Sequence, residues 1–330
     1  MKDVARLAGV SIATVSAVIN DTPIVSPKRG QRVRQAIEAL DYHPDAMARG
    51  LRTGKTLFAG VVIPDITNPF FSDLVRGAED AALRQQYSVI VCDTNEDPLQ
   101  EQRHLTGLLS RRADGLLISC SKHTGSYDIV LRRHLPVVFL EHLPNHISMP
   151  LVATGNCAGA AAATQHLIDL GHHRIAILAR NPELLAHAER IEGFRRAMQQ
   201  GGLPVRDEYF RIGGAGETDG YVFGLEMLRL KRPPTAVFSA NNKMLAGLLR
   251  AMNELDVLCP RQMSVVGFDD HIWLRAYRPP ITTVSQQSYN VGHLAMDMLL
   301  TRLAEKPLDS DQVTLPCELI VRSSTAPPDL

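Results

Sequence analysis

The hydrophobic positions of this chain change their period at about residue 58. Before that point they recur at helical spacing, which predicts three short helices within residues 1–43. The first covers residues 3–8, places Val4, Leu7 and Ala8 on one face, and ends at Gly9. The second covers residues 12–19. Two helices joined by a short turn at glycine, with a third bracing them, are typical of a helix-turn-helix.

Local residues support these helix boundaries. Ser11 can cap the second helix, and Ser26 can cap the third, which has Pro27 at its favoured first position. The spacing predicts that the third helix turns three side chains inward: Val33, Ile37 and Leu40.

From Phe58 onward, short apolar runs alternate with amphipathic segments. The runs predict buried strands over residues 58–63, 88–92, 115–119, 137–140, 174–178, 236–238 and 264–268. The predicted helices between them cover residues 72–85, 100–110, 159–170, 189–200 and 243–255. Such alternation indicates parallel sheets covered on both faces. Because residues 155–159 divide the series, we expect two doubly wound parallel-sheet subdomains, with binding in the crevice at the carboxyl ends of the strands.

A linker joins the helical head to this body. Pro44 ends the third helix, Asp45 can cap a new one, and residues 46–51 could add only about one and a half turns. So short a helix is unstable alone in water, so the segment is expected to fold when it docks.

Length and charge agree with a head and a larger body. The chain has 330 residues, 45 % of them hydrophobic, enough for about two domains. Its net charge is zero, but residues 1–55 hold nine cations against five anions, and the remainder holds 26 cations against 30 anions. A basic head on an acidic body predicts a polyanionic partner for the head alone.

Several classes are excluded by motifs that are missing. The five cysteines are scattered without a C-x-x-C pair, so we expect reduced, buried thiols, no zinc site and no cofactor or other metal. Charged residues follow Met1 directly, and no apolar run approaches the ~18 residues of a membrane helix, so a cytoplasmic protein without a membrane partner is expected. No nucleophile elbow or zinc helix is present, and His172-His173 is interpreted as structural, so an enzyme is disfavoured.

Short motifs along nearly the whole chain carry a resemblance to a known family. The head has Asp3-Val4-Ala5-Arg6-Leu7-Ala8-Gly9-Val10-Ser11, Thr14-Val15-Ser16, Asn20, Pro44 and Ala48-Arg49-Gly50-Leu51. The body has Asn68-Pro69-Phe70-Phe71, Ala113-Asp114-Gly115, Gly171-His172-His173-Arg174, Val266-Gly267-Phe268-Asp269 and Thr282-Thr283-Val284. In number and order these motifs resemble the lactose repressor/galactose repressor family of bacterial transcription factors. The body also resembles periplasmic sugar-binding proteins, especially the ribose type.

The resemblance implies how the chain is divided. Residues 1–43 correspond to a helix-turn-helix DNA-binding domain, 44–55 to a hinge, and 56–330 to an effector-binding and dimerisation domain. Within the body it implies one subdomain of about residues 56–154 plus 286–314 and another of about 155–285 plus 315–330.

The second helix of a helix-turn-helix reads base edges from its N-terminal side chains. Here these are Ile12, Ala13 and Ala17, which can touch thymine methyl groups. The family often has an arginine, the usual reader of guanine, where this chain has Ala17, and the two alanines could also simply fill a helix surface. By resemblance, Thr14, Ser16 and Asn20 hold phosphates.

The family's hinge forms a minor-groove helix whose leucine wedges between base pairs. Leu51 is the matching residue, flanked by Arg49 and Arg52, and packing of Leu51 on the body is the alternative. Asp45 replaces the family's asparagine, which keeps the cap but repels phosphate.

Polar residues at the ends of the body's strands match the sugar-binding pattern. The matching set is Asn68, Phe70, Phe71, Glu141, His142, Arg190, Asn241, Asn242, Asp269 and Gln286. The two phenylalanines are expected to sandwich a sugar ring, although Phe71 has a strong rival role in the core and Phe70 less so. The arginine fork and the amides suit adjacent hydroxyls, although each residue alone could be an ordinary surface or capping residue.

At two positions the sequence departs from the family's pattern, and both changes remove a larger or charged side chain from the predicted pocket. Asn242 replaces a frequent aspartate, and Ala215 replaces a frequent large aromatic residue. A cation at His142 would suit a sugar acid, so a sugar and a sugar acid both stay open as effectors. Trp273, the only tryptophan, either covers the crevice or packs against the body.

These observations favour a regulator, and specifically a repressor, that binds a near-palindromic operator in double-stranded DNA as a homodimer. A sugar or sugar-acid effector would control its affinity, with the sign of the effect left open. The alternative is a soluble sugar-binding module without DNA function.

Overall fold

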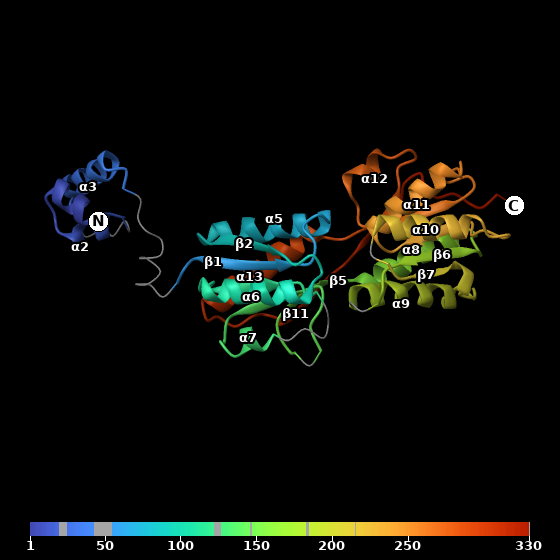
Figure 1. Cartoon of the computed structure of the whole chain (residues 1–330), viewed down its shortest axis with the longest axis horizontal. Helices are drawn as coiled ribbons and strands as arrows, with labels where there is room; N and C mark the ends of the chain where they lie inside the picture. The colour runs from blue at the N-terminus through green and yellow to red at the C-terminus, as the bar shows by residue number, and fades with distance from the viewer. Residues whose placement is uncertain are drawn as a thin grey trace. The chain divides into compact units, whose positions relative to one another are not determined.

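The protein has two compact units, Met1–Leu57 and Phe58–Leu330, which are described separately (Figure 1). The computed structural model describes residues 1–19, 25–42, 55–121, 127–145, 147–182, 185–214 and 216–329. Within these residues, no helix is long and apolar enough to cross a bilayer.

The first unit consists of short helices around a small apolar core. They are α1 (Lys2–Ala8), α2 (Ile12–Ile19) and α3 (Pro27–Ala39). Gly9 ends α1 in the left-handed conformation at φ 60°, which suits a residue without a side chain. Ser11 caps α2 as predicted, because its Oγ accepts from the backbone N–H of Thr14 at 3.2 Å. Pro27 opens α3 as predicted, but Ser26 makes no side-chain capping bond.

Two of the predicted core positions of the head are wrong. Leu7 is 57 % exposed and Leu40 is 43 % exposed. Helical spacing identifies the residues that share one face of a helix. The angle at which α1 and α3 pack then decides which side of that face is buried. The core is therefore completed by the smaller side chains Ala5 and Ala36 beside Val4, Val15 and Val33.

The body has two α/β lobes, which lie side by side in Figure 1. The first lobe has a six-stranded, all-parallel sheet in the order β11-β5-β4-β3-β1-β2. Its strands are β1 (Phe58–Ile63), β2 (Ser88–Asp93), β3 (Gly115–Ile118), β4 (Val137–Leu140), β5 (Leu151–Thr154) and β11 (Gln312–Leu315). Its helices are α5 (Pro69–Arg84), α6 (Pro98–Ser110), α7 (Asp128–Leu131) and α13 (Ser288–Leu303).

The second lobe has a six-stranded sheet in the order β12-β10-β9-β8-β6-β7. Its strands are β6 (Ile175–Ala179), β7 (Phe210–Ile212), β8 (Ala236–Ser239), β9 (Ser264–Phe268), β10 (Thr282–Ser285) and β12 (Glu318–Ile320). Its helices are α8 (Asn156–Asp169), α9 (Leu185–Gln200), the short 3₁₀ helix η1 (Asp207–Tyr209), α10 (Glu217–Leu228), α11 (Asn242–Glu254) and α12 (Ile272–Ala276). The edge strand β12 runs antiparallel to β10, so this sheet is not purely parallel.

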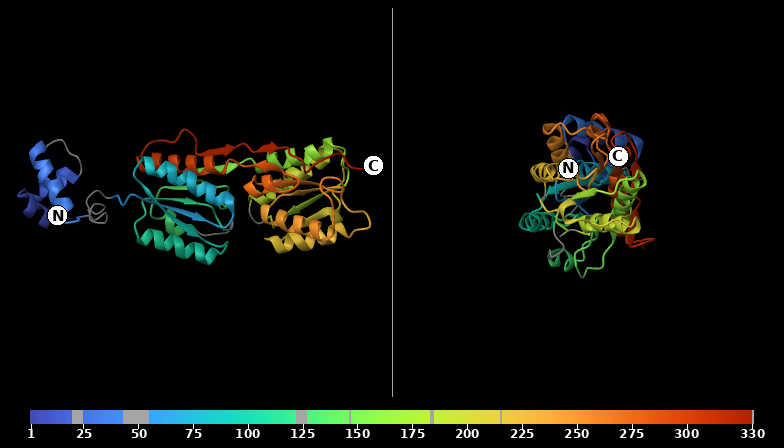
Figure 2. Two further views of the ribbon diagram at one scale, coloured as in Figure 1. Left: turned by 90° about the horizontal axis from the view of Figure 1, so that it is seen from above. Right: turned by 90° about the vertical axis from the view of Figure 1, so that its right-hand side faces the viewer.

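Helices cover both faces of each sheet, as the continuous apolar strands predict. In the first lobe α5 and α13 approach very closely, because a Cβ on Gly77 would lie 2.0 Å from the carbonyl oxygen of Tyr289. In the second lobe, one core lies between the sheet and α8 and α9, and the other beneath α10 and α11. Figure 2 shows the red C-terminal chain running along one side of both lobes, from β11 to β12.

All seven predicted strands are present, with ends shifted by at most one residue, but the sequence missed β5, β7, β10, β11 and β12. The missed strands are only three or four residues long, and β7, β11 and β12 are partly exposed, so they lack a continuous apolar run. All five cysteines are free thiols, but only Cys92 and Cys120 are buried, so the expectation of burial was wrong for the other three.

Candidate functional site

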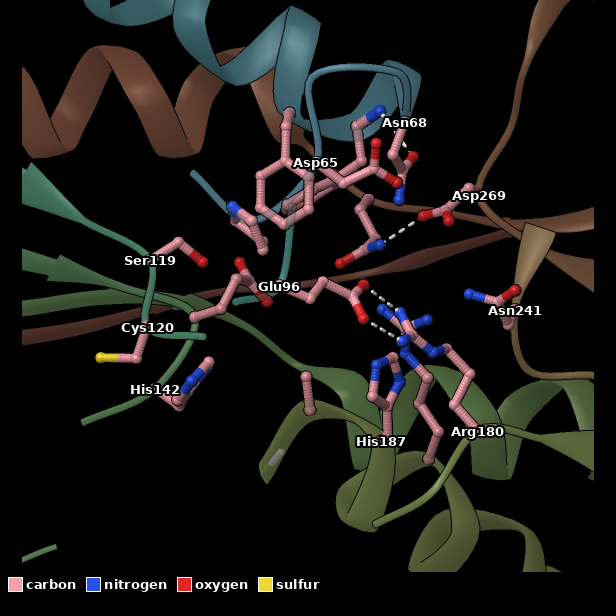
Figure 3. Close-up of a pocket in the computed structure, with 17 residues that line it drawn as sticks. Asp65, Asn68, Glu96, Ser119, Cys120, His142, Arg180, His187, Asn241 and Asp269 are labelled. Atoms are coloured by element: carbon pink, nitrogen blue, oxygen red, sulfur yellow. Dashed lines mark hydrogen bonds and ion pairs between the residues drawn. The ribbon is translucent and has the colours of Figure 1, made fainter. Parts of the chain in front are cut away.

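A cavity lies between the two lobes of the body (Figure 3). Most of its polar wall comes from residues that follow strands of both sheets, because the carboxyl ends of the parallel strands face the cleft. The lining residues are Pro64, Asp65, Asn68, Phe70, Phe71, Glu96, Ser119, Cys120, Glu141, His142, Arg180, Ala186, His187, Arg190, Asn241, Asp269 and Gln286.

Nine of the ten effector-site candidates from the sequence line this cavity, and Asn242 does not. Asn242 is nevertheless buried next to it and joins the lobes, since its Nδ2 donates to Asn68 Oδ1 at 2.9 Å. That Nδ2 also lies 2.7 Å from His271 Nε2. Asn242 therefore stands behind the wall and holds Asn68 in place.

The two asparagines in the wall also begin helices. Asn68 Oδ1 accepts from the backbone N–H of Phe70 at 3.1 Å and caps α5. Asn241 Oδ1 accepts from the backbone N–H of Met244 at 3.0 Å and caps α11. Each oxygen is used by its helix, and that of Asn68 also accepts from Asn242.

The expected aromatic sandwich is not formed. The rings of Phe70 and Phe71 contact each other edge to face, with centroids 5.0 Å apart and planes at 83°. Two rings in mutual contact leave no slot for a sugar ring between them. The order of burial is also reversed, since Phe70 is 6 % exposed and Phe71 is only half-buried. The first turn of α5, which the sequence alone did not orient, decides this.

Arg190 is buried on α9 and already has several partners. Its Nε donates to Asn156 Oδ1 and its NH1 donates to the carbonyl oxygen of Ala240, both at 2.8 Å. The guanidinium stacks on Phe268, 3.8 Å from the ring centroid. Burial lowers its pKa, while Asp269 and Glu141 act in the opposite direction. The fork is thus held rigidly, with part of its donor set committed to the protein.

Glu141 follows β4 and is almost completely buried. Its Oε2 accepts from Thr154 Oγ1 at 2.8 Å, whereas its Oε1 has no hydrogen-bond partner among the described residues. Burial raises its pKa to about 7, against the lowering effects of Thr154, Arg190 and Asn156.

Asp269 follows β9 and takes a positive φ of 76°, which aspartate tolerates better than most residues. Its Oδ1 accepts from Gln286 Nε2, on the crossover that follows β10. Gln286 Oε1 in turn accepts from Thr154 Oγ1 at 2.7 Å. These bonds connect the second lobe to the first at the cavity wall.

The sequence interpretation missed several charged and polar wall residues. They are Asp65, Glu96, Ser119, Arg180 and His187. The first four follow strands β1, β2, β3 and β6 within three residues, so the rule that found Glu141 and Asp269 could also have found them. Burial, Arg190 and Arg180 lower the pKa of His187 well below its usual value, so its ring is neutral at neutral pH.

Two charged pairs connect the lobes at the cavity. Arg180 donates to Glu96 through two bonds of 2.7 and 2.5 Å, which Figure 3 shows as dashed lines. Lys243, at the start of α11, pairs with Asp65. Burial would raise the pKa of Asp65, but the hydrogen bonds from Lys243 and Thr67 outweigh it, and the pKa is lowered. These contacts tie the lobes together beside the pocket.

Three further residues were singled out from the sequence, namely Trp273, Ala215 and His172. Trp273 lies on α12, is 37 % exposed and is not among the lining residues, so it does not cover the crevice here. Ala215 is outside the described residues. His172 is structural as expected, since its two ring nitrogens lie 2.9 Å from Thr235 Oγ1 and from the carbonyl oxygen of Ala326.

The DNA-contact candidates that can be placed lie on α2. Val15 and Val18 are buried, and the face away from them carries Ile12 and Ala13, both exposed, with Ser16 and Ala17 half-exposed. Thr14 Oγ1 lies 2.9 Å from Ser11 Oγ. The remaining candidates, Asn20, Arg49 and Leu51, lie outside the described residues.

Comparisons with known proteins agree with both units. Residues 1–45 match the family described as "Bacterial regulatory proteins, lacI family", and residues 164–325 match "Periplasmic binding protein-like domain". The chain is 36 % identical to the ribose operon repressor of Escherichia coli K12, covering 98 % of this chain and 99 % of the relative. It is 34 % identical to the transcriptional repressor PurR of Histophilus somni strain 2336, covering 98 % of each chain.

A solved structure supports the same conclusion. The lac repressor dimer bound to operator and the anti-inducer ONPF has a TM-score of 0.87 to this protein at 27 % identity, covering 98 % of each chain. The relatives are repressors and not enzymes. The chain belongs to the lacI family of bacterial regulatory proteins, and it is a DNA-binding transcriptional regulator whose activity is controlled by a small-molecule effector.

Proposed function

We propose that this protein is a repressor whose affinity for a near-palindromic operator is controlled by a neutral monosaccharide, with ribose as the first compound to test. Residues 1–43 bind DNA, residues 44–55 form the hinge, and residues 56–330 bind the effector and dimerise. The observation that supports this most strongly is the convergence of polar strand-end residues from both lobes on one cavity.

The chemistry of the cavity suits a sugar. Carboxylates accept from hydroxyls, amides both donate and accept, and arginine donates through a planar fork. The wall combines Glu141, Asn241, Asp269 and Arg190 in this way. The name of the ribose operon repressor supports a pentose as the first choice.

The charges favour a neutral sugar over a sugar acid. Four carboxyl groups line the cavity against two arginines, and Arg180 is committed to Glu96. Asp65 pairs with Lys243, and Arg190 faces the carboxyl groups of Glu141 and Asp269. A bound carboxylate would add negative charge without an uncommitted cation, which is unfavourable in a buried site.

The head supports sequence-specific DNA binding through α2. Its exposed face carries small and apolar side chains, which suit thymine methyl groups, while Lys28, Arg29, Arg32 and Arg34 on α3 supply positive charge for the phosphates. A regulator of this kind works on the chromosome, so a cytoplasmic location follows from the proposal. The lac repressor structure is a dimer bound to operator, which supports a homodimer.

Calorimetric titration of the full-length protein with ribose, ribonate and glucose tests the effector. We expect a saturable isotherm for ribose, weaker binding of ribonate because of its charge, and weaker binding of the larger glucose. Gel-shift titration of an operator selected from a random library, with and without ribose, then tests control. A shift of about 5- to 150-fold in operator affinity is typical of allosteric coupling.

Two outcomes would contradict the proposal. Binding of ribonate in preference to ribose would show that the sign of the pocket's charge is misjudged. Sugar binding without any selected DNA sequence would favour a sugar-binding module without DNA function.

A further inference from the structure

Four side chains form a continuous hydrogen-bonded chain through the hinge region of the body. Glu141 Oε2 lies 2.8 Å from Thr154 Oγ1, which lies 2.7 Å from Gln286 Oε1. Gln286 Nε2 continues to Asp269 Oδ1. This series of hydrogen bonds begins in the first lobe, passes through the crossover and ends in the second lobe. The two carboxyl groups at its ends line the cavity.

The three contacts in this series need three hydrogens. With both carboxyl groups ionised, the Thr154 hydroxyl and the Gln286 amide provide only two. Two oxygen-to-oxygen contacts meet at Thr154 Oγ1, and a hydroxyl carries one hydrogen, so it can donate to only one of them. Rotating the Gln286 amide by half a turn does not remove the deficit. Its nitrogen would then donate to Thr154, but its oxygen would face the Asp269 carboxylate. In either orientation, one carboxyl group must be protonated for every contact to be a hydrogen bond.

We propose that the unliganded protein holds this extra proton on Glu141, and that effector binding at Glu141 releases it. The protonated Glu141 donates to Thr154, Thr154 donates to Gln286, and Gln286 donates to Asp269. Each donor then has an acceptor, so the two lobes are joined by a complete chain of hydrogen bonds. The part that concerns the effector rests on the proposed function, whereas the proton itself does not.

The surroundings place the proton at Glu141. This carboxyl group is 7 % exposed, and its Oε1 accepts no hydrogen bond from the described residues. The charged and titratable groups near it are Arg190, Asp269 and Cys317, with His142 adjacent in the chain and His187 on α9. Arg190 is the one arginine that lowers its pKa, and Arg190 is shared with Asp269. Burial prevails, and the pKa of about 7 agrees with a proton held near neutral pH.

The unused Oε1 explains why the effector would release this proton. Glu141 lines the cavity, and a sugar hydroxyl donating to Oε1 stabilises the ionised carboxylate. The proton passes to solvent, and no bond to the sugar is formed. Thr154 then donates to Glu141 and no longer to Gln286. The series of hydrogen bonds is therefore broken between Thr154 and Gln286, at the crossover between the lobes. Effector affinity is therefore expected to rise with pH across neutrality.

Infrared spectroscopy of the full-length protein without effector tests the proton directly. We expect the carbonyl stretch of a protonated carboxylic acid to disappear as the pH rises through about 7. Glu141→Gln should abolish this titrating band, and Asp269→Asn should retain it. Glu141→Asp, which shortens the acid, should shift the midpoint and assigns the band even if the glutamine variant does not fold. Absence of the band in the wild type, or its loss only in Asp269→Asn, would overturn the assignment.

Calorimetry with ribose tests the release. In buffers of different ionisation enthalpy, the wild type should release a fraction of one proton per ribose near pH 7, and Glu141→Gln should release none. Ribose binding without proton release overturns the linkage. If ribose does not bind but the infrared band titrates as described, the choice of effector is wrong, while the proton on Glu141 stands.

Discussion

Glu96 and Arg180 join the two lobes of the body through a two-point ion pair, although they are 84 positions apart in the sequence. Glu96 follows β2 of the first lobe and Arg180 follows β6 of the second. Their side chains are 35 % and 16 % exposed, so the pair is partly shielded from solvent. It bridges the lobes beside the cavity and favours the closed cleft.

Removing this pair should weaken effector binding. Arg180→Gln is expected to lower ribose affinity by about 3- to 10-fold, because a partly shielded ion pair of this geometry contributes about 1 kcal/mol. Glu96→Gln should have a similar effect, and the double variant should be no worse than either single one. Calorimetry of the four proteins completes the cycle. Additive losses would show that the two residues act independently.

Arg190 should be sensitive even to a change that keeps its charge. Arg190→Lys loses the planar fork that holds Asn156 and the carbonyl of Ala240, so ribose affinity is expected to fall by at least about tenfold. Arg196→Ala, on the exposed side of the same helix, is the matched control and should bind ribose like the wild type. Equal affinities for the wild type and Arg190→Lys would remove Arg190 from the site.

The base preference of α2 should change with one substitution. Ala17 is half-exposed on the helix face away from Val15, and an arginine there can donate two bonds to a guanine. Ala17→Arg is expected to create a preference for a G·C pair worth ~1 to 3 kcal/mol. Selection from a randomised operator library measures it. An unchanged selected half-site would mean that α2 is not the reading helix.

His172 should make the body sensitive to acid. Burial lowers the pKa of this ring, which bridges Thr235 and the C-terminal chain at Ala326. A lowered pKa means that the folded protein disfavours the charged ring. The stabilising effect of the neutral ring is therefore complete above the pKa of the unfolded state, about 6.5. It is lost as the pH falls from there through the lower pKa of the folded state.

Chemical unfolding of the wild type and of His172→Ala at several pH values measures this effect. The variant should lose about 2 to 4 kcal/mol at neutral pH, from two hydrogen bonds and a cavity. The difference between the two proteins should shrink below pH 6.5. A difference that stays constant with pH would contradict a neutral, buried ring.

Features governed by neighbouring residues were readable from the sequence. Gly9 and Ser11 mark the turn of the head, because left-handed backbone and helix capping are decided within a few residues. The same holds for the seven apolar strands and for Glu141 and Asp269, since a parallel sheet directs the ends of its strands to one edge. Arg180 and Glu96 follow β6 and β2 and obey this rule as well, so their place in the wall could also be predicted from the sequence.

The sequence by itself thus determined the helix-turn-helix, the two-lobed α/β body and most of the cavity wall, because period, capping and strand-end position are local properties. Only the tertiary structure decided which wall residues are already engaged. It turned Phe70 against Phe71, committed Arg190 to Asn156, and buried Glu141 with one oxygen unbonded. These outcomes depend on how side chains pack once the elements are assembled. The first turn of α5 turns the two rings together, α9 packs against α8, and Thr154 of β5 reaches the Glu141 carboxyl group.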